Sequence, residues 1–432
     1  MAPRTPAEAL AFFSRLSPSS IKLGLERVEA ALAALGHPER RYPALHVAGT
    51  NGKGSTCAFA SAALHAAGHR VGLYTSPHLV RVNERIRVGG EDIDDEVFGQ
   101  RILEVLEHYP EAPALTYFEF GTVVAFWHFA REAVDVAVVE VGLGGRLDAT
   151  RACQPGVTAI TPVSFDHMEY LGHTLGAIAG EKAGILKPGV PVVVSHQEPE
   201  ALAAIERVAR ELGAPVSREG RDFSLTVRPD GRLVYEGRGG PLEGLTLGLR
   251  GEHQRGNAAV ALASLEFLSA RGLVVPAEAR RAGLAQARWP GRLEELPGAP
   301  PVLLDGAHNP AGVGVLLEGL RSLYPGRRVH CVFGVVADKD RGPMLRALLP
   351  ACDSVHLTPL DTPRSLAPAH YLDEVRAMCP NAHAYPTLDA ALEGARARVL
   401  GSDVILCTGS LFLVGSVRAR WADRLGALHH SS

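Results

Sequence analysis

Short apolar runs alternate with longer helical patterns through roughly the first half of the chain. The runs are rich in Val, Ile and Leu, and they cover residues 44–47, 70–75, 134–141, 157–161 and 190–195. Strands that are apolar on both faces and separated by helices are typical of a parallel sheet covered by helices on both sides. We therefore expect an α/β domain built on a mostly parallel sheet.

The pattern changes between residues 223 and 250. Polar and apolar positions alternate there around Pro229, Asp230 and Gly231, and a helical pattern resumes at Asn257. Alternation around a Pro-Asp-Gly turn indicates a β-hairpin. We expect this hairpin to be an accessory at the edge of the first domain.

Residues 288–301 concentrate proline and glycine, which indicates a domain boundary. Further strand candidates follow it at residues 302–304, 328–335, 354–358 and 404–407, with helical patterns among them. The chain is therefore expected to contain a domain of residues 1–290 followed by a smaller, Rossmann-like α/β domain of residues 291–432.

The net charge and the hydropathy of the chain limit the kinds of partner that we expect it to bind. The 432 residues carry a formal net charge of −3, so nothing attracts nucleic acid or an acidic membrane in general. Residues 1–6 do not resemble a signal peptide, and no apolar run approaches the roughly 18 residues of a membrane span. We expect a cytoplasmic protein without nucleic-acid or membrane partners.

One loop has the composition of a phosphate site. The apolar run that ends at residue 48 leads into a glycine-rich loop and then a helix of small residues. The loop comprises Gly49, Thr50, Asn51, Gly52, Lys53, Gly54, Ser55 and Thr56. Its backbone N–H groups and lysine suit phosphate oxygens, and its hydroxyls suit Mg²⁺. The spacing departs from GxxxxGK[ST], because Gly49 is four residues before Lys53 and Gly54 separates Lys53 from Ser55. We predict a P-loop-containing first domain that binds ATP.

Two further strand ends carry candidate metal ligands. Glu140 ends the apolar run 134–141, and His167 follows the run 157–161. A buried carboxylate needs a cation, so Glu140 is a candidate Mg²⁺ ligand, with a structural salt bridge as the alternative. His167 is equally a candidate ligand or a structural histidine. The glycine-rich residues 142–150 are expected to line the substrate, with a second nucleotide fingerprint as the alternative.

Nine motifs in order give the chain a specific resemblance. It resembles the folylpolyglutamate synthase and dihydrofolate synthase family, relatives of the muramyl peptide ligases, over nearly its whole length. The motifs start at Gly49, Thr75, Phe118, Glu140, Asp166, Glu181, His253, Trp289 and Asp305 and read GTNGKGS, TSPHL, FEF, EVGLGGRLDAT, DH, EKAGI, HQ, WPGR and DGAHNP.

The resemblance implies a nucleotide pocket between two domains with two Mg²⁺ ions. It matches Ser76, Glu140 and His167 to metal-binding positions, and Lys182 to a lysine that the family carries as a carbamate. From the residues alone, Lys182 would be an ordinary cation on a helix surface.

The resemblance also matches Asn257, Arg292 and Asp305 to ATP-binding positions, and it places His308 in a motif linked to catalysis together with Lys53 and Lys182. The guanidinium fork of Arg292 suits phosphate. Asp305 ends an apolar strand, and its alternative role is that of a helix N-cap.

A pterin surface is implied at Phe118, Asp148 and Ala149. An aromatic ring can stack on a flat pterin and a carboxylate can accept its N–H groups, although core packing is the alternative for Phe118. The family usually has Asn where this chain has Arg151, which affects pterin selectivity rather than ligase chemistry.

The implied activity is ATP-dependent ligation of L-glutamate to dihydropteroate and to the γ-carboxylate of tetrahydrofolates through an acyl phosphate, by a monomer. The alternatives are folylpolyglutamate synthase activity alone, a muramyl-type ligase with a UDP-linked acceptor, and a binding module without catalysis.

Overall fold

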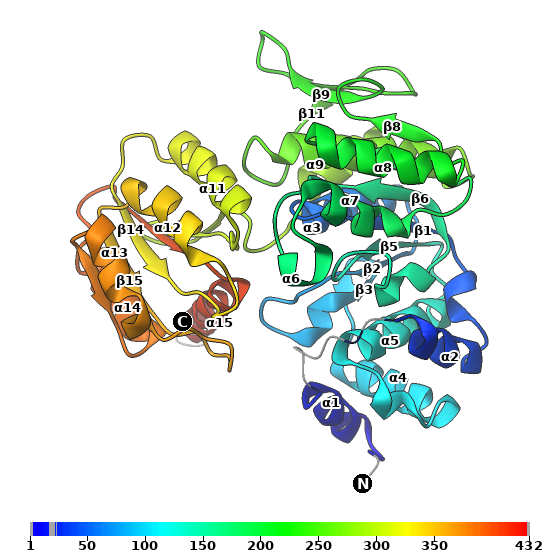
Figure 1. The fold of residues 1–432 in the computed structure, drawn as a ribbon, viewed down its shortest axis with the longest axis horizontal. Coiled ribbons are helices and arrows are strands. Elements are labelled where there is room, and N and C mark those ends of the chain that lie inside the picture. The colour runs from blue at the N-terminus through cyan, green and yellow to red at the C-terminus, as the bar shows by residue number, and fades with distance from the viewer. Residues whose placement is uncertain (1–2, 17–21, 23, 430–432) are drawn as a thin grey trace. The chain divides into compact units, whose positions relative to one another are not determined.

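The computed structural model describes residues 3–16, 22 and 24–429 (Figure 1). Contacts within the chain divide it into two compact units. The first unit comprises Met1–His78, Val82–Gly248 and Gln254–Arg288, and the second comprises Leu79–Arg81, Leu249–His253 and Trp289–Ser432.

The first unit is built on an eight-stranded sheet with the order β4-β3-β2-β5-β1-β6-β7-β8. All neighbours from β2 to β8 are parallel, and β3 and β4 add an antiparallel edge. The strands are β1 (Ala44–Ala48), β2 (Val71–Tyr74), β3 (Ile86–Val88), β4 (Glu91–Asp92), β5 (Val136–Glu140), β6 (Pro155–Ile160), β7 (Val192–Val194) and β8 (Val216–Arg218). The mostly parallel sheet predicted from the apolar runs is confirmed.

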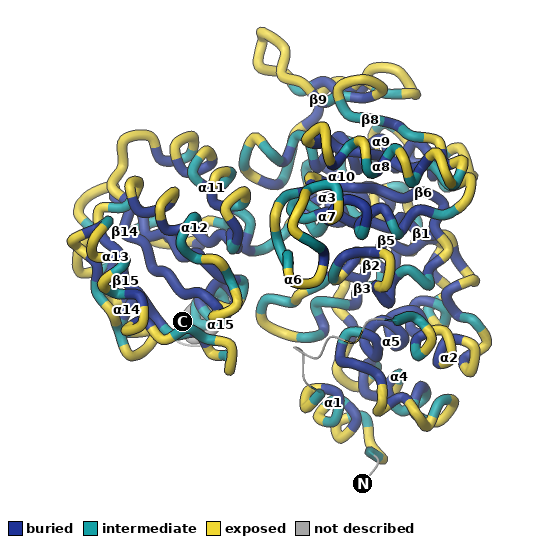
Figure 2. Tube along the Cα trace, in the orientation of Figure 1, coloured by how far each residue is buried: buried dark blue, intermediate teal, exposed yellow. Residues whose placement is uncertain are grey.

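Helices cover both faces of this sheet, and as a result every residue of its central strands β1 and β5 is buried (Figure 2). Strands buried on both faces explain the continuous apolar runs in the sequence. The helices of the first unit are α1 (Pro6–Ser14), α2 (Glu26–Ala34), α3 (Lys53–Ala66), α4 (Asp95–His108), α5 (Tyr117–Arg131), α6 (Met168–Leu171), α7 (Leu175–Lys182), α8 (Pro199–Glu211), α9 (Gln254–Ser269) and α10 (Ala277–Gln286).

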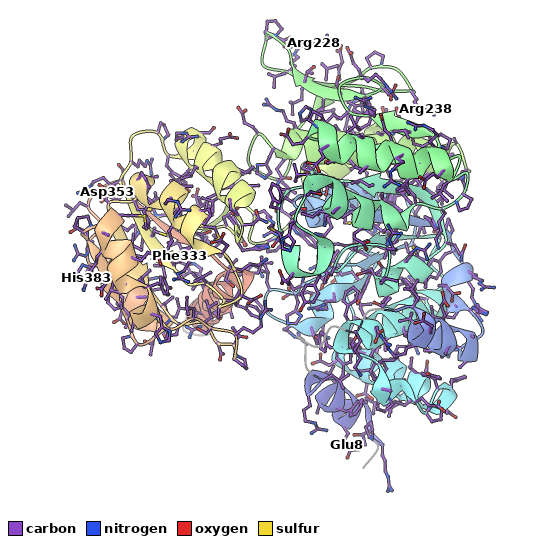
Figure 3. All side chains as sticks on the ribbon, in the orientation of Figure 1. Glu8, Arg228, Arg238, Phe333, Asp353 and His383 are labelled. Carbon is purple, nitrogen blue, oxygen red and sulfur yellow. The ribbon has the colours of Figure 1, made fainter. Side chains whose placement is uncertain are left out.

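The predicted hairpin is part of a separate antiparallel sheet of three strands, β9 (Ser224–Val227), β10 (Leu233–Glu236) and β11 (Leu242–Leu245). The β9–β10 turn lies where Pro-Asp-Gly predicted it, and the N–H of Arg228 donates to the carbonyl of Arg232 at 2.9 Å. Figure 3 labels Arg228, which directly follows β9, and Arg238, which lies two residues beyond the end of β10. The sequence indicated the turn but not the third strand.

The second unit contains a six-stranded sheet with the order β12-β13-β17-β14-β15-β16, parallel except for the β12–β13 pair. Its strands are β12 (Glu294–Leu296), β13 (Val302–Leu304), β14 (Val329–Phe333), β15 (Ser354–Leu357), β16 (Ala382–Ala384) and β17 (Val404–Thr408). Its helices are α11 (Pro310–Leu323), α12 (Arg341–Leu348), α13 (Leu372–Met378), α14 (Leu388–Arg396) and α15 (Leu411–His429). This is the smaller doubly wound α/β unit that the sequence predicts.

Two details differ from the sequence pattern. The segment 288–301 is more than a linker, because β12 folds back and pairs antiparallel with β13. The short strands β3, β4, β8, β12 and β16 were not predicted, because none of them is a continuous apolar run like the equally short β7 and β13. Among the described helices, none combines the length and the apolar character that crossing a membrane requires.

Candidate functional site

Three neighbouring strands of the first unit end at the same level. Val47 of β1 pairs with Glu140 of β5, and Ala48 pairs with Ile160 of β6. The segments that leave these strands therefore emerge from one edge of the sheet. Ligands of open α/β sheets bind at the carboxyl ends of the strands, next to a point where the strand order reverses.

The phosphate loop follows β1, and Lys53 is the first residue of α3. Gly52 precedes it with φ 89°, and a Cβ at this position would lie 2.3 Å from Oδ1 of Asn257. Only glycine tolerates both the positive φ and the contact. The predicted nucleotide residue Asn257 thus lies against the loop, and the helix N-terminus favours an anion.

The phosphate loop is hydrogen-bonded to the segment that follows β6. Thr50 Oγ1 donates to the carbonyl of Ser164 and accepts from its N–H, both at 3.1 Å. The N–H of Thr50 donates to the carbonyl of Pro162 at 2.9 Å. Ser164 is a residue that sequence reasoning did not single out, and nothing in its neighbours indicates this contact.

The two predicted hydroxyls differ in their surroundings. Thr56 is fully buried, and its Oγ1 lies 3.5 Å from the carbonyl of Asn257, to which it donates. Ser55 is 3% exposed. Since Thr56 is used to join α3 to α9, Ser55 is the hydroxyl that suits a metal or phosphate. Lys53 Nζ donates to the carbonyl of Thr50 at 3.2 Å.

The candidate metal ligands come from three segments of this unit. The N–H of Ser76 donates to Oε2 of Glu140 at 3.0 Å, and Glu140 is 4% exposed. His167 has φ 49° and its Nε2 lies 3.9 Å from Oδ2 of Asp166. A histidine held in the left-handed region is strained, and such strain clusters at functional sites.

No three His, Cys, Asp or Glu side chains gather closely enough to hold a metal within the part of the chain that the structure describes. A divalent ion at this edge therefore needs other oxygen donors as well. Hydroxyls, phosphate oxygens and a modified lysine are such donors.

Lys182, the last residue of α7, is 5% exposed, so the alternative of a helix-surface cation is wrong. Its Nζ donates to the carbonyl of Gly49 at 2.9 Å. Burial, and next the charge of Lys53, lower the pKa of Lys182 to about 7. A large fraction of this amine is therefore neutral near pH 7.

The three predicted pterin residues lie on one short loop and the start of α5. The Phe118 ring lies on Gly142, where an added Cβ would be 2.5 Å from Cζ of the ring. Phe118 is partly exposed, and its ring centroid lies 5.9 Å from that of Tyr74. The ring thus packs against Gly142 and Tyr74 and remains partly exposed to solvent.

Asp148 and Ala149 are buried, at 5% and 4% exposure. The Asp148 carboxylate accepts from the N–H groups of Gly142, Leu143 and Thr150 at 2.9–3.1 Å, and from the hydroxyl of Thr150. Burial raises the pKa of Asp148, and these donors oppose the rise. As it stands, the carboxylate holds the 142–150 loop in shape.

The glycine-rich loop is also attached to the turn that carries Lys182. Arg146 pairs with Glu181 at 3.1 Å, and Arg151 Nε donates to the carbonyl of Gly184 at 2.8 Å. The unusual Arg151 therefore ties the loop to the residues just after Lys182.

In the second unit, Asp305 follows β13 and accepts from the N–H groups of Ala307 at 2.9 Å and Leu293 at 3.0 Å. Burial raises its pKa, and Arg292 opposes the rise. The alternative of Asp305 as a helix N-cap is wrong, because Asn309 caps α11. His308 Nδ1 lies 2.7 Å from the carbonyl of Gly306.

Comparison with known proteins decides the family. Residues 47–265 match the Mur ligase middle domain, and residues 291–411 match the Mur ligase glutamate ligase domain. The chain is 36% identical to dihydrofolate synthase/folylpolyglutamate synthase of Bacillus subtilis, with 93% of this chain and 95% of that protein covered. It is 37% identical to the Escherichia coli protein of the same name, with 96% of each covered. The chain belongs to the dihydrofolate synthase/folylpolyglutamate synthase family. It is an ATP-dependent ligase of the Mur ligase superfamily.

Solved structures of the family have the same fold. The structure of Escherichia coli FolC in complex with DHPP and ADP superposes with a TM-score of 0.88 at 36% identity and covers 98% of both chains. The Yersinia pestis bifunctional folylpolyglutamate synthase/dihydrofolate synthase, complexed with AMPPNP and Mn ion, gives a TM-score of 0.87 at 33% identity and covers 97% of this chain and 99% of that one.

Proposed function

We propose that this chain adds L-glutamate to dihydropteroate and to the γ-carboxylate of tetrahydrofolates, with ATP as co-substrate. One observation carries the proposal: buried Lys182 donates to the phosphate loop, and its neighbour Glu181 pairs with Arg146 of the glycine-rich loop on which the Phe118 ring packs. These contacts bring Lys182, the phosphate loop and the glycine-rich loop together in the first unit, which supports their use in one reaction. Relatives named for both activities support both substrates.

The reaction has two steps. A carboxylate oxygen of the folate substrate attacks the γ-phosphorus of ATP and displaces ADP. The product of this step is a folate acyl phosphate. The glutamate amine then attacks the acyl carbon, inorganic phosphate leaves, and the amine loses a proton to give the amide. Two anions meet in the first step, so positioned positive charge is the main catalytic need.

In this proposal, the loop residues Gly49 to Thr56 bind the ATP phosphates, and Lys53 stabilises the charge that develops on them. Glu140, Ser76 and His167 would hold Mg²⁺, and the residues present fit that ion. Glu140 is a buried carboxylate at the carboxyl end of its strand, with a Ser76 amide already pointed at it. Two Mg²⁺ ions would neutralise phosphate charge.

Lys182 is proposed to act as a carbamate. Its neutral amine would attack the carbon of CO₂: a C–N bond forms, one C=O bond opens to give a carboxylate, and the nitrogen releases a proton. The product is an anionic carbamate, and its oxygen would be a ligand for a second Mg²⁺. The low pKa and the confined position of Lys182 support this change, because a protonated amine cannot react.

Phe118, Asp148 and Ala149 are proposed to form the pterin surface. The partly exposed ring of Phe118 stacks on the pterin, and Ala149 lies beside it. Each Asp148 oxygen already accepts two hydrogen bonds, so Asp148 contributes chiefly by shaping the loop. A pterin N–H group would have to share an oxygen with these donors.

Residues 1–290 are proposed as the ATP-binding domain and residues 291–432 as the glutamate ligase domain. Asn257 of the former, and Arg292 and Asp305 of the latter, would bind ATP, and His308 would take part in catalysis. The Arg292 guanidinium fork suits phosphate, and Asp305 is held rigidly by two backbone N–H groups. We further propose a cytoplasmic monomer, which light scattering and cell fractionation would check.

Product mass and ADP release test the function. Purified enzyme with ATP, Mg²⁺ and glutamate receives dihydropteroate, tetrahydrofolate or a UDP-linked muramyl acceptor in separate reactions. Glutamylation of the first two supports the proposal, and glutamylation of tetrahydrofolate alone reduces it to polyglutamate synthesis. Reaction of the muramyl acceptor alone, or ATP binding without any amide, would overturn it.

A further inference from the structure

A fully buried histidine lies behind the folate loop. His46 is in the middle of β1 with 0% exposure, and its Nε2 lies 2.9 Å from Oγ1 of Thr150. Its Nδ1 is buried and has no hydrogen-bond partner among the residues that the structure describes. An unpaired polar atom in a core strand opposes folding, so the stability of β1 does not explain this residue.

The direction of the hydrogen bonds follows from Asp148. Backbone N–H groups donate to both oxygens of its carboxylate, two to Oδ2 and one to Oδ1, so both oxygens act as acceptors. The hydroxyl proton of Thr150 therefore points to Asp148. The Thr150 oxygen is left as an acceptor, and His46 must supply the proton on Nε2. Burial lowers the pKa of His46 to about 3, which agrees with a neutral ring carrying one proton.

This chain of contacts reaches the folate surface. Asp148 Oδ2 accepts from the N–H of Gly142 at 3.1 Å, and the Phe118 ring lies directly on Gly142. Ala149, the first residue of the turn that Asp148 caps, precedes Thr150. A shift of the Thr150 hydroxyl would therefore move the groups proposed to contact the pterin.

We propose that His46 is a positioning residue for the folate substrate: its Nε2–H group fixes the Thr150 hydroxyl on Asp148 and thereby holds the 142–150 loop under Phe118. The inference rests on the proposed folate function. His46 itself does not touch the substrate, because none of its side chain is exposed.

The test compares the KM values of the two kinds of substrate. His46→Leu removes the donor and should raise the KM of dihydropteroate and tetrahydrofolate about tenfold, equivalent to about 1.4 kcal/mol, with the KM of ATP within about twofold. His46→Gln should restore most of the affinity, because its amide N–H can donate to Thr150. Leu45→Val, a change of similar burial in the same strand, is the matched control for general loosening and should leave the folate KM unchanged.

A double-mutant cycle separates positioning from stability. Thr150→Val removes the hydroxyl through which His46 acts, so adding His46→Leu to it should raise the folate KM no further than Thr150→Val alone. Fully additive effects, an equal rise in the KM of ATP, or no rescue by His46→Gln would overturn the proposal. If His46→Leu does not fold, Thr150→Val and His46→Gln still decide the matter. Wild-type enzyme that glutamylates neither folate would defeat the proposed function and this inference together, whereas active wild type with unchanged variants would defeat the inference alone.

Discussion

The two units of this molecule place their candidate site residues at similar positions, at the ends of buried strands, but fix these residues through different kinds of contact. In each unit an acidic residue ends or follows a buried strand: Glu140 at the end of β5 and Asp305 after β13. In the second unit the fixing contacts are mostly local, since Asp305 accepts from Ala307, His308 contacts Gly306 and Asn309 caps α11.

The first unit relies on contacts between distant segments. Thr50 is fastened to Ser164, 114 residues away, and Lys182 to Gly49, 133 residues away. The 142–150 loop is held by His46 through Thr150, 104 residues apart. Substitutions at such contacts should therefore disturb substrate binding, whereas substitutions at the local contacts should mainly change stability.

The largest effect is expected at the phosphate loop itself. Lys53→Ala removes the cation at the first residue of α3 and should reduce kcat by at least about 10²-fold, as expected for a preorganised charge stabiliser. Steady-state ADP release measures it, with exposed Lys22→Ala as the matched control. Near-normal kcat in folded Lys53→Ala would remove this lysine from the mechanism.

Gly142→Ala should weaken folate binding next most strongly. The new Cβ would lie 2.5 Å from the Phe118 ring, so the ring or the loop must move. Overpacking of this kind costs about 1–3 kcal/mol, and a rise of about tenfold in the folate KM is expected. Isothermal titration with dihydropteroate and ATP separates the two substrates. Unchanged folate affinity would show that the ring does not form the pterin surface.

Carbamylation of Lys182 gives a pH-dependent prediction. Only the neutral amine reacts with CO₂, and the pKa of Lys182 is lowered to about 7. After CO₂ depletion, the rate of reactivation at fixed CO₂ should rise about tenfold from pH 6 to pH 8 and then level off. The rate for an ordinary lysine would keep rising toward pH 10. Activity that is insensitive to CO₂ depletion, with an unmodified Lys182 in the mass spectrum, would contradict the carbamate.

A smaller effect is expected where the phosphate loop is fastened. Thr50→Val keeps the shape but removes the hydroxyl that both donates to and accepts from Ser164. The loss of two hydrogen bonds at about 0.5 kcal/mol each, about 1 kcal/mol together, should raise the KM of ATP about fivefold. The folate KM should change less. Equal changes for both substrates would indicate general unfolding of this edge.

The local contact in the second unit should have the smallest effect on activity. Asn309→Ala removes the side-chain cap of α11 and should lower the unfolding free energy by about 1 kcal/mol. Thermal denaturation measures the loss, with Asn309→Ser as the control that keeps a cap. A kcat reduced as strongly as in Lys53→Ala would break the distinction between the two units.

The sequence predicted what depends on neighbours in the chain. Buried strands such as β1 and β5 are continuous apolar runs, and the phosphate loop has its own glycine and lysine pattern, so both units and the edge with Glu140 could be expected. The burial of Lys182 could not, because it depends on Gly49 in a distant segment. His46 carried a signal that was overlooked, a polar residue in an apolar strand, whereas Ser164 carried none.

Isotope transfer from the folate carboxylate tests the central claim most directly. Dihydropteroate labelled with ¹⁸O in both carboxylate oxygens is incubated with enzyme, ATP, Mg²⁺ and glutamate, and the products are analysed by mass spectrometry. Ligation through an acyl phosphate places one ¹⁸O in the released inorganic phosphate and leaves the other in the new amide. Phosphate without ¹⁸O, at a normal rate of ADP release, would show that ATP hydrolysis does not activate the folate carboxylate and would contradict the account.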